Sequence, residues 1–313
     1  MKTHLLTAAL LAAIAAPTTL TAEEKPQYRS SKEIIDSAPA SAWRTPAPEN
    51  LLYMEFGEGR LAIIELAPQF APQHVENIRR LARGGFWDGT SIYRSQDNFV
   101  VQFGDAHAED AAKAKPLPQD VAQKLPAEFK RSTQGLAFTP MPDRDGWAAE
   151  VGFVDGFHAA RNQADGEAWM THCYGLLGAG RGNAPDSSIG AELYVVTGQS
   201  PRALDGNITS VGRVLRGMEF LSVLPRGPEP LGMYTDPAMH TPIKRIRLGS
   251  EIPASERLQL EVMRTDAPEF AKAVEARRNR RDAWYVHPAG HIDICNISVP
   301  VREKASPARQ SHQ

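Results

Sequence analysis

The sequence predicts a mainly β fold, because it contains short apolar runs of strand length that are joined by turn signals. Residues 51–56 and 60–66 form one such pair around the Gly-Glu-Gly turn at residues 57–59. Residues 91–93 and 99–102 form a second pair around a polar link that contains Asp-Asn, which favours turns. Both pairs are typical of antiparallel hairpins. Further strand-like runs are residues 170–178, 192–196, 211–215 and 242–248.

Besides a short helix in the arm at residues 23–47, helical patterns are expected at residues 70–85, 218–224 and 267–281, here called the first, second and third helix. In the first of them apolar residues recur at helical spacing, so one face should pack on the β structure and cover one end of it. Asp266 is expected to cap the third helix, because a carboxylate at that position can accept a hydrogen bond from the first turn. Helices are therefore a minority of this fold.

Arg94 is the unusual residue of the second hairpin, because its always-charged guanidinium lies among β-branched and aromatic neighbours. Gln102 lies at the far end of the same hairpin. On this local pattern alone, Arg94 is either a solvated strand residue, which is the more common arrangement, or a residue of a functional site.

Residues 1–22 have the features of a signal peptide. Lys2 supplies a basic start, residues 5–16 are an apolar run, and small residues lead up to Ala22. The apolar run is too short to span a bilayer as a stable helix. We therefore expect export to the periplasm or the cell exterior with cleavage after Ala22; the alternative is a buried N-terminal helix.

The charge balance argues against a nucleic-acid-binding protein. The chain has 35 Lys plus Arg against 37 Asp plus Glu, and loss of Lys2 with the signal peptide leaves 34 against 37, a net charge of −3. No later apolar run approaches membrane-spanning length, so no stable membrane insertion is expected after cleavage.

Two blocks of the sequence, in this order, resemble the cyclophilin family of peptidyl-prolyl cis-trans isomerases. The first matches the family at Asp88-Gly89, Arg94, Phe99, Gln102 and Gly104-Asp105. The second contains Leu204-Asp205-Gly206 and the segment Val-Gly-Arg-Val-Leu-Arg-Gly-Met at residues 211–218, which resembles the family's Phe-Gly-Arg-Val-x-x-Gly-Met. Two separate blocks make the resemblance much stronger than either block alone.

The resemblance implies a closed eight-stranded antiparallel barrel capped by two helices. It ends beyond Glu251, where the residue pattern indicates a small α+β extension at the C-terminus. It implies isomerisation of X-Pro bonds in proline-containing polypeptides, with no metal and no cofactor. By the same resemblance Arg94 and Gln102 would be catalytic. The residues implied to bind substrate are Phe99, Val100, Glu192, Tyr194 and Leu204.

On this basis the chain divides into five parts. They are a signal peptide at 1–22, a lead-in arm at 23–50, a barrel domain at 51–250, a helix and hairpin extension at 251–301, and a disordered tail at 302–313. The barrel domain carries an insertion at about 106–170, in which residues 140–165 are loop-like. The insertion is either a lid beside the binding groove or a surface excursion without function. In the extension, residues 284–286 and 291–299 are expected to form the hairpin.

Several positions depart from the family pattern. Ala203 replaces a Trp, Ile208 replaces a His, and the loop Asn has only Gly180 or Arg181 as its counterpart. Glu192 replaces a Gln and could pair with Arg94 or Arg181. These departures suggest an alternative function, a binding module or holdase chaperone that keeps the barrel but isomerises weakly.

Cys173 and Cys295 are the only cysteines. In an oxidising compartment they could form a disulfide, and burial as two free thiols is the equal alternative. The segment Asp143-Arg144-Asp145-Gly146 resembles the start of a calcium loop, but it lacks the later ligands and the closing Glu. We therefore interpret that segment as a turn.

Overall fold

The structure, a computed structural model, describes residues 28–199 and 201–304. It confirms a closed barrel of eight antiparallel strands in the order β11-β12-β5-β4-β14-β2-β3-β13. The signal peptide expected at residues 1–22 lies outside the described residues. The barrel strands are β2 (Leu51–Phe56), β3 (Leu61–Leu66), β4 (Ser91–Ser95), β5 (Val100–Gly104), β11 (Leu176–Ala179), β12 (Leu193–Val196), β13 (Ser210–Arg216) and β14 (Thr241–Leu248).

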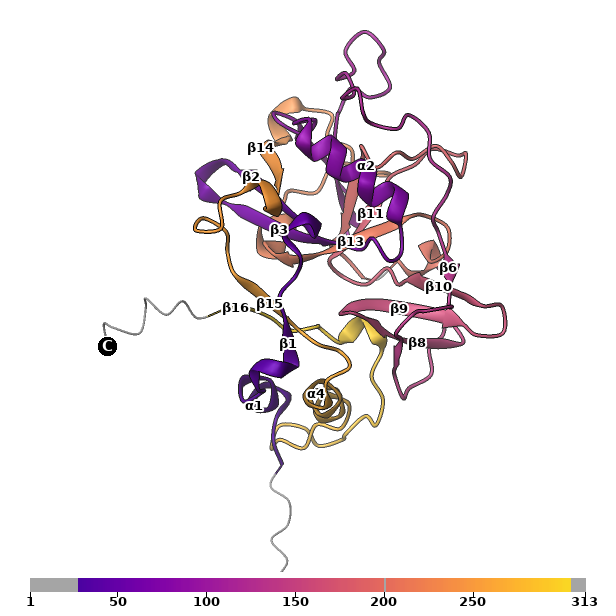
Figure 1. Ribbon diagram of the computed structural model, residues 1–313, viewed down its shortest axis with the longest axis vertical. Coiled ribbons are helices and arrows are strands. Elements are labelled where there is room, and N and C mark those ends of the chain that lie inside the picture. The colour runs from indigo at the N-terminus through magenta and orange to yellow at the C-terminus, as the bar shows by residue number, and fades with distance from the viewer. Residues whose placement is uncertain (1–27, 200, 305–313) are drawn as a thin grey trace, which may run out of the picture.

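Side chains fill the interior of the barrel. Leu52 and Met54 alternate with Tyr53 along β2, so the first two are buried inside and Tyr53 packs on the outside. Helix α2 (Pro72–Arg83) lies across the barrel in Figure 1 and buries its apolar face in the same core. The short helix α3 (Met218–Leu221) adds Leu221 to this core. Because the interior is filled, a binding site has to lie on the outer surface.

The insertion folds into a sheet of its own, so the prediction that residues 140–165 are loop-like is wrong. Its strand order is β6-β10-β9-β8-β7. Strands β8 and β9 form a hairpin around Asp155 and Gly156, whose φ angles are 49° and 84°. Asp-Gly is a preferred pair for such a tight turn. The strands are β6 (Arg131–Ser132), β7 (Thr139–Pro140), β8 (Glu150–Val154), β9 (Phe157–Asn162) and β10 (Glu167–Met170).

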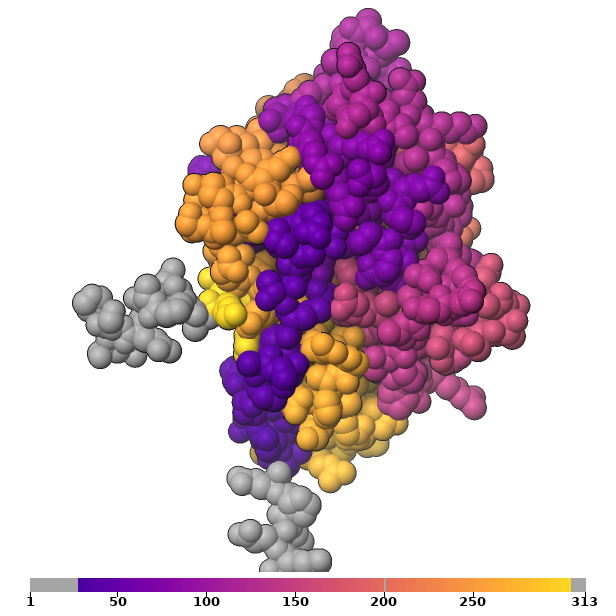
Figure 2. All heavy atoms as spheres, viewed as in Figure 1, coloured from indigo at the N-terminus to yellow at the C-terminus, as the bar shows by residue number. Residues whose placement is uncertain are grey.

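The N-terminal arm and the C-terminal extension fold together. Strand β1 of the arm pairs with β15, which pairs with β16, and helix α1 packs on α4. This part lies below the barrel in Figure 1, and Figure 2 shows the indigo arm packed against the orange extension. Trp43, Phe153 and Phe270 lie in a second apolar core that also joins the insertion sheet. The elements are α1 (Ser31–Asp36), β1 (Trp43–Arg44), β15 (Leu260–Met263), α4 (Pro268–Arg278) and β16 (Val301–Glu303).

Three expectations for the extension are wrong. Residues 284–286 and 291–299 form no strands, and Trp284 and Val286 are 79% and 97% exposed, so they have no core to pair over. Ala267, not Asp266, is the N-cap of α4, and the Asp266 carboxylate instead forms an ion pair with Arg264. The disordered tail was expected to begin at residue 302, but strand β16 runs to Glu303. Residues 305–313 lie outside the described residues.

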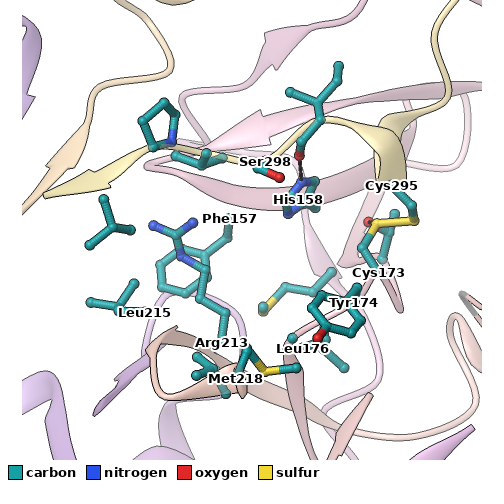
Figure 3. A pocket seen from close by; sticks show the side chains of 18 residues that line it. Phe157, His158, Cys173, Tyr174, Leu176, Arg213, Leu215, Met218, Cys295 and Ser298 are labelled. Atoms are coloured by element: carbon teal, nitrogen blue, oxygen red, sulfur yellow. Dashed lines mark hydrogen bonds between the residues drawn. A yellow bond between two sulfur atoms is a disulfide. The ribbon is translucent and has the colours of Figure 1, made fainter. Parts of the chain in front are cut away.

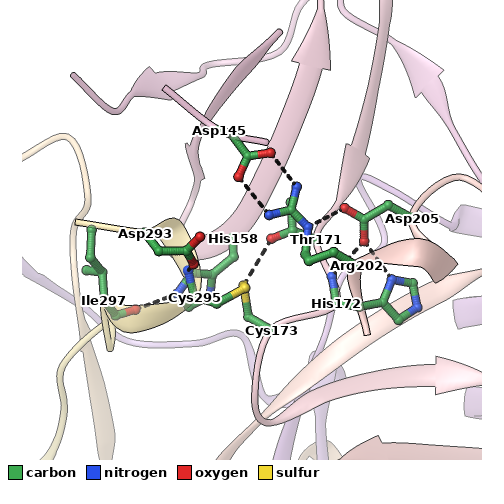
Figure 4. Close-up of a disulfide and its surroundings, with 10 residues drawn as sticks. All are labelled: Asp145, His158, Thr171, His172, Cys173, Arg202, Asp205, Asp293, Cys295 and Ile297. Atoms are coloured by element: carbon green, nitrogen blue, oxygen red, sulfur yellow. Dashed lines mark hydrogen bonds and ion pairs between the residues drawn. A yellow bond between two sulfur atoms is a disulfide. The ribbon is translucent and has the colours of Figure 1, made fainter. Parts of the chain in front are cut away.

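A disulfide joins Cys173, between β10 and β11, to Cys295 in the extension (Figure 4). The two residues are 122 positions apart in the sequence. The bond therefore ties the extension to the junction of barrel and insertion. Within residues 28–199 and 201–304, no helix is long and apolar enough to cross a membrane.

Candidate functional site

Three of the predicted site residues lie in one row across neighbouring barrel strands. Arg94 on β4 is paired with Gln102 on β5, and Gln102 is paired with Tyr194 on β12. Val101 and Phe103, the neighbours of Gln102, point into the barrel core. Because side chains alternate along a strand, Gln102 points to the outer surface. The barrel thus brings the row together on its outside.

The row forms one side of a cavity of about 170 Å³, which we call the cup. Six of the seven predicted catalytic and substrate-binding residues line it. Only Glu192 does not, and Gly180, Arg181 and Ile208 complete the wall. The lining consists of Arg94, Phe99, Val100, Gln102, Gly180, Arg181, Tyr194, Leu204 and Ile208.

Arg94 is held in place by three hydrogen bonds. Its Nε donates to the Leu231 carbonyl at 2.7 Å, Nη1 donates to Gln102 Oε1 at 2.9 Å, and Nη2 donates to Gln96 Oε1 at 2.5 Å. A guanidinium carries five N–H groups, so within the described part of the chain two remain for a ligand. Burial lowers the pKa of Arg94, although the group stays charged because its ordinary pKa is so high.

A hydrogen-bond relay behind Arg94 fixes the orientation of the Gln102 amide. Gln102 Nε2 donates to the Tyr93 hydroxyl oxygen at 2.7 Å, and that hydroxyl donates to Glu192 Oε2 at 2.6 Å. Because a guanidinium can only donate, Arg94 takes Gln102 Oε1 as its acceptor, which leaves Gln102 Nε2 to donate to Tyr93, and the Tyr93 hydroxyl then donates to the ionised form of Glu192. Tyr93 and Glu192 therefore hold Arg94 indirectly.

Glu192 does not form the expected ion pair with Arg94 or Arg181, so that prediction is wrong. Its second oxygen accepts a hydrogen bond from the Asp105 backbone N–H at 2.8 Å. Glu192 lines a neighbouring hollow of about 370 Å³, which shares Gln102 with the cup. Burial raises its pKa to about 7, against the opposing effect of the hydrogen bonds from Tyr93 and Asp105.

A protein-family model described as "Cyclophilin type peptidyl-prolyl cis-trans isomerase/CLD" matches residues 51–247. The chain belongs to this family. It is a divergent member: it is 25% identical over 182 residues to a "Probable peptidyl-prolyl cis-trans isomerase" of Brucella suis, a match that covers 58% of this chain and 74% of that one. It is 26% identical over 98 residues to human "Peptidyl-prolyl cis-trans isomerase-like 1", covering 31% and 56% of the two chains.

A solved structure, the cyclophilin AquaCyp293 from Hirschia baltica, is also similar. The TM-score is 0.66 at 25% sequence identity, and the match covers 83% of this chain and 92% of that chain. The similarity thus extends beyond the 197 residues, 51 to 247, that the family model matches.

The cyclophilin-type site is altered at its rim. Ala203 is exposed beside the cup, and Ile208 lines the cup, so the cup gains an apolar side chain where the family has His. Arg181 donates from Nε to the Asn207 carbonyl at 3.0 Å and lies over the Phe129 ring. Its guanidinium is therefore held at the rim of the cup by these two contacts.

Tyr93 is a site residue that the sequence did not reveal. Strict alternation along a strand places Tyr93 and Arg94 on opposite faces. The pairing of β4 with β5 shifts between Ile92 and Arg94, which is a β-bulge, and the bulge lets both side chains reach Gln102. A bulge leaves no mark in the hydrophobic pattern; the only available signal was a polar-tipped aromatic residue next to the key arginine.

A larger cavity, of about 420 Å³, lies where barrel, insertion and extension meet (Figure 3). It contains none of the cup residues. Its buried cation, Arg213, faces Glu65 at 3.5 Å and lies over the Phe157 ring, so the charge already has a partner. Among residues 28–199 and 201–304, no group of three His, Cys, Asp or Glu side chains is placed to hold a metal ion.

Proposed function

We propose that the protein isomerises X-Pro bonds of exported polypeptides in the cup, with Arg94 as the catalytic residue. The observation that carries this proposal is the position of Arg94. Its guanidinium stands at the edge of an apolar cup and still has two N–H groups to donate. A donor beside an apolar recess is the arrangement that this reaction requires.

The reaction needs a donor at the prolyl nitrogen. Amide resonance sets a barrier of about 18–20 kcal/mol to rotation about the peptide bond. When the bond is twisted, the nitrogen regains its lone pair and can accept a hydrogen bond that the planar amide cannot accept. Arg94 would donate this bond, so its interaction exists only in the transition state and lowers the barrier.

Arg94 alone does not supply the whole effect. A charge-assisted hydrogen bond contributes about 1.5–3 kcal/mol. Acceleration of an uncatalysed step of tens of seconds by about 10⁴ to 10⁵ needs about 5.5–7 kcal/mol. The remainder must come from holding the substrate and excluding water from the ring.

The other cup residues would provide this second contribution. Phe99, Val100, Tyr194 and Leu204 line the apolar part of the cup and would hold the proline ring. Gln102 would hold the substrate backbone while it orients Arg94. Glu192, in the neighbouring hollow, would contact the substrate residues beside the proline. It would also help to orient Arg94 through Tyr93 and Gln102.

Export is supported by two independent features. One is the signal-peptide pattern of residues 1–22. The other is the Cys173–Cys295 disulfide, because such bonds persist mainly in oxidising compartments. Fractionation of the producing cells, with N-terminal sequencing of the protein found outside the cytoplasm, tests this location. A mature chain that starts at Glu23 supports it, and an unprocessed cytoplasmic chain contradicts it.

A second candidate function is a binding module or holdase that isomerises weakly. Ala203 and Ile208 favour it, because both change the rim where substrate would be gripped. The two functions differ in their dependence on Arg94. Suppression of client aggregation that is unchanged in Arg94→Ala would indicate the holdase.

The folding role is tested with an unfolded protein whose slow refolding phase is limited by X-Pro isomerisation. The mature protein should accelerate this phase, and Arg94→Ala should not. Arg245→Ala is a matched control, because Arg245 is a partly exposed barrel arginine that pairs with Glu55 away from the cup. An unaltered slow phase with wild-type protein would contradict the role in folding.

A further inference from the structure

A buried polar network lies directly behind the Tyr194 wall of the cup. The Tyr194 hydroxyl and His172 Nε2 are 2.9 Å apart, and His172 Nδ1 is 2.9 Å from Asp205 Oδ1. Since the carboxylate can only accept, Nδ1–H donates to Asp205, and in the neutral imidazole Nε2 accepts from the tyrosine hydroxyl. The ring planes of His172 and Tyr194 are nearly parallel, with an interplanar angle of 11° and ring centroids 6.3 Å apart.

The network continues from Asp205 into the insertion (Figure 4). Arg202 donates from Nε to Asp205 Oδ2 at 2.5 Å, and from Nη1 and Nη2 to the two oxygens of Asp145 at 2.9 and 3.0 Å. The side chains of Arg202 and Asp145 are only 3% and 1% exposed. A chain of hydrogen bonds thus connects the insertion to the cup.

Every charged group in this network has its partners. Asp145 also accepts from the backbone N–H groups of Trp147 and Ala148, at 2.7 and 2.9 Å. Asp205 also accepts from the backbone N–H of His172 at 2.9 Å. Buried charges are costly unless they are fully hydrogen-bonded, and a fully bonded network holds its members rigidly.

The network acts on two walls of the cup. Arg202 and Leu204 belong to the same short 3-10 helix, Arg202–Leu204, and Leu204 lines the cup. The second wall is Tyr194, which the network holds by its hydroxyl. Apolar contacts reinforce it, because Phe157 of the insertion lies in one cluster with Tyr194 and Val100.

We propose that Asp145, Arg202 and His172 are positioning residues of the cup, so that the insertion is part of the isomerase. This inference rests on the proposed function of the cup. Ala203 is exposed at the place where the family has a Trp, so no aromatic side chain braces the 202–204 segment there. The Arg202–Asp145 pair holds that segment instead, from the buried side.

The neighbouring Asp143 gives a matched control. It lies two residues from Asp145 in the same insertion, its side chain is 7% exposed, and it accepts from Arg278 of α4 at 2.8 and 2.9 Å. Asp143→Asn therefore breaks another Asp–Arg pair of the insertion, in which Asp143 is buried and the Arg278 side chain is 25% exposed, and which leads to the extension and not to the cup.

The experiment measures kcat/KM for a short Ala-Pro peptide together with the unfolding temperature, for wild type, Asp145→Asn and Asp143→Asn. At a temperature where all three are folded, Asp145→Asn should lower kcat/KM about tenfold, whereas Asp143→Asn should leave it unchanged. Equal values in the two variants would overturn the proposal.

The same peptide is also titrated into each variant and followed by NMR. If the wild type is inactive, the proposed function is refuted, but the positioning role can still be tested by peptide affinity. Binding that is weakened in Asp145→Asn but not in Asp143→Asn supports the positioning role. Equal binding in the two variants refutes it.

A double-mutant cycle tests the route through the tyrosine hydroxyl. Tyr194→Phe removes only that hydroxyl, and His172→Gln removes its acceptor. If His172 acts through Tyr194, the double variant should be no slower than the slower single variant. Losses in kcat/KM that multiply in the double variant would show that His172 acts independently of the Tyr194 hydroxyl, and would remove it from the proposal.

Discussion

Gly178 and Tyr194 face each other across β11 and β12, and the tyrosine ring occupies the space that a side chain at position 178 would need. A Cβ on Gly178 would lie 2.2 Å from Cζ and from the hydroxyl oxygen of Tyr194. The missing side chain therefore lets the phenol lie flat in the cup wall and reach His172. The geometry of the cup depends on this glycine.

Gly178→Ala should displace the Tyr194 ring and damage the cup. We expect a loss of about 1–3 kcal/mol in the free energy of unfolding, as for other overpacked sites, and a fall in kcat/KM of about tenfold or more. Gly57→Ala is the control, because a Cβ there has no atom within 4 Å. Full activity in Gly178→Ala would show that the ring position is unimportant.

Tyr93→Phe should weaken isomerisation without removing any group of the cup. The change takes the acceptor from Gln102 Nε2, so the amide loses its fixed orientation and Arg94 loses a defined partner. We expect kcat/KM to fall about 3- to 10-fold, which corresponds to one hydrogen bond. Tyr53→Phe is a matched control, because its partly buried hydroxyl donates to the Leu258 carbonyl at 3.3 Å, and Tyr53 does not line the cup. If both variants lose activity equally, the relay does not act on Arg94.

Glu192 should give the protein a pH-dependent stability. Its pKa is raised by burial from 4.5 to about 7, so between these values the folded chain holds a proton that the unfolded chain has lost. The free energy of unfolding should therefore fall as pH rises from about 4.5 to 7, by up to about 3 kcal/mol, and this contribution should level off above pH 7. Denaturant unfolding of wild type and Glu192→Gln across this range measures the difference. An identical pH dependence in the two proteins would rule out a raised pKa for Glu192.

Removal of the disulfide should destabilise the whole chain. Cross-linking two residues 122 positions apart restricts the unfolded state, so the Cys173→Ser, Cys295→Ser double variant should lose about 2–4 kcal/mol. Denaturant unfolding of both proteins, with and without reductant, measures this loss. Reductant should affect only the wild type. Mass spectrometry of the unreduced protein shows whether the bond is present, and two free thiols there would contradict it.

The row of Arg94, Gln102 and Tyr194 was predictable because it depends on local motifs that the barrel always places side by side. The β-bulge at Tyr93 was not, because a change of register depends on the partner strand. The insertion sheet was only partly predictable from the sequence. The Asp155-Gly156 turn signal was present in the sequence, but strand β8 is stabilised by Phe270, a residue more than a hundred positions away.

In the extension, by contrast, the sequence pattern predicted strands where none form. Residues 284–286 have the aromatic and β-branched composition of a strand, yet Trp284 and Val286 are almost fully exposed. The strands that do form, β15 and β16, pair with each other and with β1 of the N-terminal arm. Composition gave the propensity for strands, but only these long-range partners determined which segments became strands.

The central claim, prolyl isomerisation by Arg94, is tested most directly with short X-Pro peptides. The exchange rate between cis and trans is measured with wild type, Arg94→Ala and the control Arg245→Ala, for several residues before the proline. We predict that wild type and the control accelerate exchange equally, and that Arg94→Ala loses about 10- to 150-fold of kcat/KM, the range that corresponds to a bond of about 1.5–3 kcal/mol. No acceleration by folded wild-type protein on any peptide, or full activity in Arg94→Ala, would contradict the account.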